Sequence, residues 1–231
     1  MFLIAAAWRL VHDDRQVAAG LVLAVLLFKP QVAIPIIGLF LLGRYWRVVI
    51  GAAVGAAAFY ATGAVLQGWR WGVDWIDVAA GFGRLDAEVN GHSSISFIGM
   101  SENLFGVAAS PPVVVAWLLA AVTAGFLGWL WWRGEHTDLG ILLAITMPGI
   151  LLLSPHTMSQ DGAIVVLSAA IVVATWDWRN WLPWIAVIWV LGATQLWIRQ
   201  LGFSPGFPML LVVLVLAWLL LRDSERRPIQ P

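Results

Sequence analysis

Long apolar runs, separated by short polar or basic stretches, make up most of the chain. A helix needs about 20 apolar residues to cross the hydrocarbon core of a bilayer. The pattern predicts spans over residues 47–67, 111–132, 138–153, 162–177, 181–199 and 206–222. We therefore expect an all-α fold: a polytopic transmembrane helix bundle of about seven to nine membrane segments, with residues 1–231 as a single integral membrane domain.

One apolar stretch, residues 16–42, is interrupted by the sequence Phe-Lys-Pro-Gln at 28–31. Proline lacks a backbone N–H and disfavours helix at the preceding residue, so the helix should break at Lys29. The pattern predicts two short helices, 16–28 and 31–42. They form either a hairpin that enters and leaves the membrane on one side or one long kinked span, and we expect the hairpin.

The connection over residues 68–110 is too long for a simple turn. Its tryptophan-rich first half is typical of an amphipathic helix lying at the membrane interface. Its polar second half predicts a structured loop. By the positive-inside rule, most arginines face the cytoplasm, and this connection faces the other side, as do the loops at 154–161 and 200–205.

Composition supports a membrane protein. The chain is 61% hydrophobic and 11% charged, whereas soluble domains carry about 25% charged residues. The formal net charge is zero, which argues against a nucleic-acid partner. The absence of cysteine excludes disulfides, thiolate metal sites and cysteine nucleophiles. We expect a multi-pass protein of the cell (inner or plasma) membrane, in contact with membrane lipids, with its C-terminus in the cytoplasm.

Lys29 is the first candidate for function. A cation within an apolar run is costly unless it is paired or hydrated, and its compact ammonium suits a phosphate oxygen. The alternative is a lysine that reaches the interface from a helix end. Gln31, beside Pro30, would line the same polar break.

The loop sequence Ser-Pro-His-Thr-Met-Ser-Gln-Asp at 154–161 is the second candidate. The imidazole of His156 can bind a phosphate or move a proton near neutral pH. Asp161 could orient that imidazole, or it could cap the helix that follows. The simpler alternative is an ordinary loop between two helices.

Further polar groups are weaker candidates. Those of the loop at 86–103 could bind a hydroxyl-rich molecule or simply face water: Asp86, Glu88, Asn90, His92, Ser94 and Glu102. Arg199 could bind a phosphate or anchor its helix at the interface. The spacing of acids and histidines predicts no metal site, and no cofactor is expected.

Three stretches together resemble glycosyltransferase family 87, the polyprenyl-phosphate-mannose-dependent mannosyltransferases of the GT-C membrane superfamily. "AAGLVLAVLLFKPQVAIPIIGLFLLGRYWRVVIG" resembles its Lys-Pro-Gln helix, "NGHSSISFIGM" its Asn-x-Ser segment, and "LLLSPHTMSQD" its Ser-Pro-His element. The resemblance extends over nearly the whole chain but only over the C-terminal half of the family's length. The family's catalytic acidic residue is therefore expected upstream of Met1.

The resemblance implies a donor, an acceptor and a set of roles. A hexose, mannose by resemblance alone, would pass from a polyprenyl-phosphate donor to a glycan or glycolipid acceptor on the extracytoplasmic side. Lys29 and His156 would converge on the donor phosphate, helped by Gln31 and Arg199. The loop residues Asn90, His92 and Ser94 would hold the acceptor, and Asp86 or Glu88 would be poor substitutes for the base.

Two other classes of protein fit the same pattern. A transporter or flippase for a lipid-linked or anionic substrate also uses broken helices with a charge at mid-depth. A catalytically inactive truncated remnant, or a subunit that pairs with a separate N-terminal half, would fit the missing acidic loop.

Overall fold

The computed structural model describes residues 1–106, 110–134, 137–175, 182–198, 204 and 206–226. Within these ranges the chain forms eleven α-helices and no β-strand, which confirms the all-α prediction. The helices fall into two compact units, residues 1–88 with 128–135 and residues 89–127 with 136–231. We call them the first and the second unit. That they act as one membrane domain remains a prediction.

The predicted spans correspond to helices within a few residues at most ends. The helices concerned are α4 (Trp46–Gln67), α7 (Ser110–Arg133), α8 (Leu139–Leu153), α9 (Val165–Thr175), α10 (Leu182–Ile198) and α11 (Gly206–Arg226). Among the described residues, two helices are long and apolar enough to cross a membrane, α4 and the Pro111–Arg133 part of α7. Only 17% and 22% of their most apolar windows are buried in the protein. Such exposed apolar surface favours lipid over water as the surrounding solvent.

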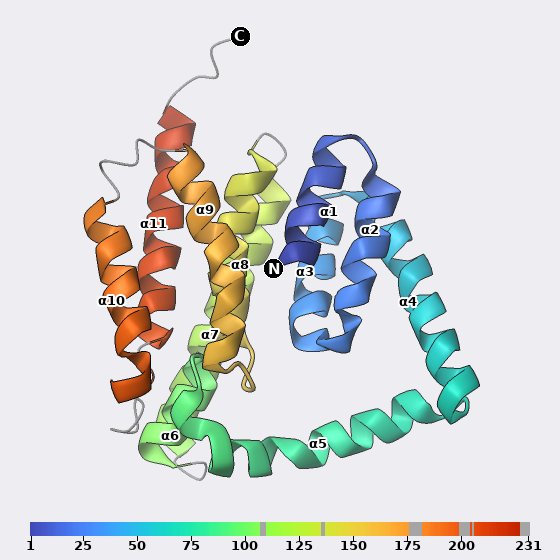
Figure 1. Ribbon diagram of the computed structural model, residues 1–231, viewed down its shortest axis with the longest axis horizontal. Coiled ribbons are helices and arrows are strands. Elements are labelled where there is room, and N and C mark those ends of the chain that lie inside the picture. Colours follow the sequence, from blue (N-terminus) through green and yellow to red (C-terminus); the bar gives the residue numbers. More distant parts are fainter. Residues whose placement is uncertain (107–109, 135–136, 176–181, 199–203, 205, 227–231) are drawn as a thin grey trace. The chain divides into compact units, whose positions relative to one another are not determined.

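The first unit contains the predicted hairpin. Helix α1 (Phe2–His12) is followed by α2 (Gln16–Ala24), which tightens into the 3₁₀ turn η1 (Val25–Phe28), and α3 (Pro30–Leu42) then returns beside α2 (Figure 1). Lys29 separates the arms with a non-helical backbone, φ −131° and ψ 73°. The two arms therefore form a hairpin rather than one kinked span, as predicted. That the hairpin enters and leaves a membrane on one side remains a prediction. Each arm of 13 residues is about 20 Å long, too short to cross a bilayer core alone.

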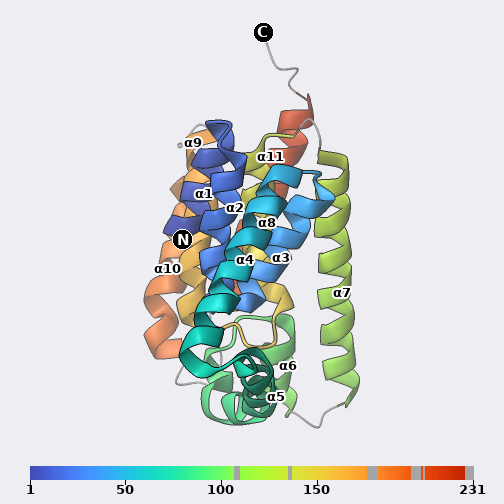
Figure 2. The ribbon, with the colours of Figure 1, turned by 90° about the vertical axis from the view of Figure 1, so that its right-hand side faces the viewer.

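Small residues let α2 and α4 pack with their backbones in close contact (Figure 2). A Cβ atom at Gly51 would overlap the carbonyl oxygen of Val17, and one at Gly20 would lie 2.6 Å from the backbone nitrogen of Ala52. Gly55 faces Ala24 one turn further along. This is the close helix approach that glycines four residues apart permit in membranes.

Aromatic side chains pack between the helices at both ends of the first unit. At one end, the ring of Phe40 packs edge-on against Trp131 and Tyr45, with centroids 4.9 and 5.4 Å apart. At the other end, Gly68 ends α4 with φ +92°, a conformation that favours glycine. The indole N–H of Trp71 then donates to the Tyr60 carbonyl at 3.0 Å, which holds the start of α5 (Trp71–Asn90) against α4.

Helix α5 confirms the helix predicted in the tryptophan-rich half of the connection, but the polar half was predicted wrongly as a loop. Helix α5 continues to Asn90, so Asp86 and Glu88 lie on its last turns. After the short turn η2 (Gly91–Ser93), a further helix, α6, spans Phe97–Phe105. Helix formed because Ser96 accepts a hydrogen bond from the Gly99 N–H and so caps α6, and Gly106, at φ +84°, ends it.

The second unit is built around α8, which is buried from Gly140 to Leu152. Asp138 caps its start by accepting hydrogen bonds from the N–H groups of Gly140 and Ile141 at 2.7 and 3.3 Å. Helices α9 and α11 pack against it, and the core they share comprises Ile95, Leu151, Leu152, Val165, Leu210 and Val213. Ile95 belongs to this core although it lies in the polar connection, so the connection is anchored to the second unit.

Candidate functional site

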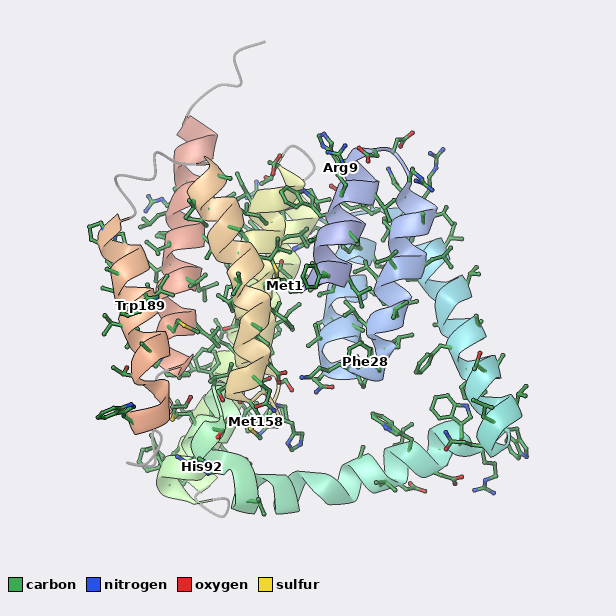
Figure 3. The ribbon with its side chains drawn as sticks, viewed as in Figure 1. Met1, Arg9, Phe28, His92, Met158 and Trp189 are labelled. Atoms are coloured by element: carbon green, nitrogen blue, oxygen red, sulfur yellow. The ribbon has the colours of Figure 1, made fainter. Side chains whose placement is uncertain are left out.

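The second unit joins two of the polar segments singled out in the sequence. Ser94 and Met158 form an isolated antiparallel bridge, and the Ile95 N–H donates to the Thr157 carbonyl at 3.0 Å. Figure 3 shows His92 and Met158 at the same end of this unit. The Asn-x-Ser segment and the Ser-Pro-His element therefore form one structure, although 63 residues separate Ser94 from Thr157.

The loop at 154–161 is held by its own side chains. Ser154 ends α8 and accepts a hydrogen bond from the His156 N–H at 3.4 Å, while the Thr157 hydroxyl donates to the Ser154 carbonyl at 3.2 Å. The Asp161 carboxylate is 6% exposed and accepts from the Met158 N–H at 3.2 Å. These bonds present His156 as an exposed side chain on a fixed backbone. That Asp161 also orients the imidazole remains a prediction.

Replacing Asp161 by alanine is expected to destabilise the protein by about 2 kcal/mol, because the buried N–H of Met158 loses its acceptor. Asparagine keeps an oxygen at the same place, so Asp161→Asn should cost less. Thermal unfolding of the purified protein in detergent measures both. An unchanged melting temperature in Asp161→Ala would contradict this role.

Helix α6 lies directly against the loop that carries His156. A Cβ atom at Gly99 would come within 3.0 Å of the Pro155 carbonyl oxygen. Glu102, one helical turn further, is half-buried, and burial raises the pKa of its carboxyl group, while the positive charge of His156 acts in the opposite direction. Nothing in the sequence separated Glu102 from acids that face water, and its burial near the loop comes from the fold.

An apolar groove of about 480 Å³ lies on α6, between this helix, the start of α7 and Phe207 of α11. Its walls include Met100, Leu104 and Val115. Ser101 also lines it, and the buried hydroxyl of Ser101 has no hydrogen-bond partner among the described residues. Helix α6 thus borders both an apolar groove and the polar loop.

The structure describes the side chains of only two of the other residues predicted to bind an acceptor, His92 and Ser94. His92 is half-buried on η2. Ser94 is 1% exposed, and its hydroxyl donates to the Thr157 carbonyl at 3.4 Å. The Ser94 side chain therefore stabilises the backbone bridge between Ser94 and Met158. The side chains of Asp86, Glu88 and Asn90, and all of Arg199, lie outside the described residues.

In the first unit, Lys29 lies at the tip of the hairpin, and Phe28 marks that tip in Figure 3. The neighbours of Lys29, Phe28 and Pro30, line a pocket of about 500 Å³ together with Ala56 and Tyr60. Ala56 and Tyr60 lie near the middle of the 22-residue helix α4. The tip of the hairpin therefore lies beside the middle of a helix that is long enough to cross a membrane. That Lys29 lies at mid-depth in a bilayer remains a prediction.

The pocket beside the tip has aromatic walls, among them Phe59, Trp71 and Trp75. A second pocket of about 560 Å³ shares Phe28, Phe59 and Trp71 with it. Gln31 is half-buried in the first turn of α3. Lys29 and Gln31 thus belong to the first unit and His156 to the second, and their convergence on one ligand remains a prediction.

The described residues thus combine two apolar helices of membrane length, a lysine at the tip of a short hairpin and a polar loop that bears an exposed histidine. The model of glycosyltransferase family 87 matches residues 1–155. The chain belongs to this family, which makes it a membrane glycosyltransferase by class. The match includes the hairpin and α6 and ends one residue before His156. No curated protein and no solved structure matches the chain.

Proposed function

We propose that the chain acts in the transfer of a hexose, most simply mannose, from a polyprenyl-phosphate donor to a glycan or glycolipid acceptor. The transfer would take place on the extracytoplasmic side of the plasma (inner) membrane, with the C-terminus of the chain in the cytoplasm. One observation carries the proposal: in a chain of family 87, Lys29 lies at the tip of a hairpin halfway along α4, beside pockets lined by aromatic residues.

A lipid-linked phosphate donor would account for a lysine at the tip of a hairpin between apolar helices. An uncompensated ammonium in the membrane interior costs several kcal/mol, whereas a phosphate oxygen offsets that cost with charge and hydrogen bonds. The pockets beside Phe28 are apolar and aromatic, which suits the isoprenoid units next to that phosphate. Membrane lipids would cover the outer faces of the same helices.

The reaction exchanges one bond at the sugar. The bond from the anomeric carbon to the phosphate oxygen breaks, a bond to the acceptor oxygen forms, and the acceptor hydroxyl gives its proton to a base. The departing polyprenyl phosphate gains negative charge, so fixed cationic donors stabilise the transition state more than the ground state. We assign that role to Lys29 and His156, with Gln31 and Arg199 in support. Acceptor contacts fall to Asn90, His92 and Ser94, with Asp86 and Glu88 nearby in sequence.

A transfer assay in isolated membranes tests the proposal. Membranes containing the chain, or a version extended upstream by the acidic loop of the family, receive polyprenyl-phosphate mannose or a nucleotide-linked mannose, each radiolabelled in the sugar. We expect label in a glycan or glycolipid product only with the lipid-linked donor, and not in membranes that lack the protein. Transfer from the nucleotide-linked donor when polyprenyl-phosphate synthesis is blocked would contradict it, as would no transfer by either version.

A further inference from the structure

Arginines from three separate segments gather at the end of the first unit that lies opposite the tip of the hairpin. Figure 3 shows Arg9 at this end and Phe28 at the tip. We call it the basic end; it comprises the turn from α1 to α2, the turn from α3 to α4 and the last turn of α7. Its exposed arginines are Arg9, Arg15, Arg44, Arg47 and Arg133.

Ring contacts join the turn from α3 to α4 to the last turn of α7. The guanidinium of Arg44 lies 5.3 Å from the centre of the Trp132 ring. Arg133 follows Trp132 directly, and its guanidinium lies 5.6 Å from the centre of the Trp129 ring. Both contacts are within the range in which a cation is attracted to the face of an indole. Arginines from distant parts of the chain are therefore held on one surface.

The turn from α1 to α2 joins this surface through the packing of α2 on α4. Because a Cβ atom at Gly51 would overlap the Val17 carbonyl, the starts of the two helices lie side by side. Arg15 directly precedes α2, and Arg47 is the second residue of α4. Arg15 and Arg47 therefore belong to the same end of the first unit.

Acids offset only part of this charge. Among the described residues of the basic end, the acids are Asp13 and Asp14. Asp13 pairs with Arg9, with its carboxylate 3.0 Å from the guanidinium. Beyond the other end of α4, by contrast, Arg70 is followed by Asp74 one helical turn later. The basic end thus carries a surplus of positive charge that the opposite end lacks.

Exposed tryptophans accompany the arginines. Trp46, Trp129 and Trp132 are 58%, 52% and 60% exposed. An exposed indole is favoured at a bilayer interface, where its ring contacts acyl chains and its N–H contacts headgroups. Trp46 begins α4, one of the two described helices long and apolar enough to cross a membrane. A soluble phosphate would account for the arginines alone, whereas a lipid accounts for the tryptophans as well.

We propose that the basic end binds the phosphate headgroups of anionic phospholipids. Arginine presents a planar fork of N–H donors that matches phosphate oxygens, and an anionic leaflet favours each added arginine beside a membrane span by about fivefold in affinity. Such a site holds the basic end at one membrane surface, with the hairpin tip one arm, about 20 Å, deeper. The inference does not rest on the proposed function, because it requires no sugar transfer.

Lipid binding by the purified protein in detergent tests the proposal. Native mass spectrometry measures a Kd for phosphatidylglycerol, for phosphatidylcholine and for glycerol 3-phosphate, which has the phosphate but no acyl chain. We expect phosphatidylglycerol to bind the most tightly of the three. Equal affinities for the two phospholipids would overturn the proposal, because the arginines would then not select an anionic headgroup. Binding of glycerol 3-phosphate as tight as that of phosphatidylglycerol would also overturn it.

Variants locate the site. Arg47→Gln should weaken the binding of phosphatidylglycerol by about fivefold and Arg15→Gln with Arg47→Gln by about thirtyfold, while Arg47→Lys keeps most of the affinity. Arg70→Gln is the matched control, because Arg70 is an exposed arginine beyond the other end of α4 that also lies over an indole, 5.8 Å from the centre of the Trp69 ring. It should bind phosphatidylglycerol as the wild type does.

The melting temperature in lipid-free detergent should be the same for all four variants, because the arginines concerned are exposed. Where the double variant is less stable, Arg47→Gln alone decides. Equal losses of phosphatidylglycerol binding in Arg47→Gln and Arg70→Gln would overturn the proposal, as would wild-type binding by Arg47→Gln.

Discussion

Lys29→Ala is expected to lower the rate of sugar transfer by about a hundredfold or more, the usual effect of removing one fixed donor from a developing negative charge. Lysine presents a point charge from the tip of the hairpin, where its neighbours line the aromatic pocket. Lys29→Arg keeps the charge in a different shape and should retain part of the rate, whereas Lys29→Gln should not. Initial rates with radiolabelled polyprenyl-phosphate mannose measure all three variants.

Arg9→Ala is the matched control, because Arg9 is an exposed cation whose guanidinium pairs with Asp13 at 3.0 Å, away from the hairpin tip. We expect it to transfer at the wild-type rate. Protein amounts must be equal among the variants, as judged by immunoblot of the membranes. A wild-type rate in Lys29→Ala would remove the lysine from the reaction and leave the interfacial anchor as its explanation.

Gly51→Ala is expected to destabilise the first unit by about 3 kcal/mol, since its Cβ atom would overlap the carbonyl oxygen of Val17. The obstacle is backbone, which no side-chain rotation can clear, so α2 and α4 must separate. Loss of this contact should also displace the hairpin tip, because α2 leads directly to Lys29. Thermal unfolding in detergent, together with the yield of monodisperse protein, measures the effect.

Gly38→Ala offers the matched comparison. Gly38 lies inside α3, and nothing lies within 4 Å of the Cβ that alanine would add. Because alanine favours helix over glycine, we expect unchanged or slightly raised stability, by about 1 kcal/mol at most. Equal melting temperatures for the two variants would show that the close α2–α4 contact does not limit the stability of the protein.

Local rules predicted the hairpin from sequence. Lys29-Pro30 stops one helix and starts the next, so both arms were expected within one residue of their observed ends. Helix α6 carries the same kind of boundary signal, with Ser96 at its start and Gly106 at its end. The polar residues around it nevertheless led to the prediction of a loop. Helix boundaries can be predicted where a cap or a proline marks them, even within a polar segment.

The pairing within the candidate site could not be predicted in the same way. The bridge between Ser94 and Met158 joins segments distant in the chain, and no local propensity encodes such a partner. The environment of Glu102 has the same origin, since its burial follows from α6 packing beside the loop. Resemblance to the family supplied the two segments in order, and only folding brought Ser94 and Met158 into contact.

The short arms of the hairpin have a consequence for how a lipid reaches Lys29. With each arm about 20 Å long against a bilayer core of about 30 Å, the hairpin occupies only part of the membrane depth, while α4 continues past its tip. Beside the tip, α4 and the start of α5 line the aromatic pocket that also includes Phe28. The proposed lipid-linked donor would reach this pocket from the side, with its tail still among the acyl chains of one leaflet.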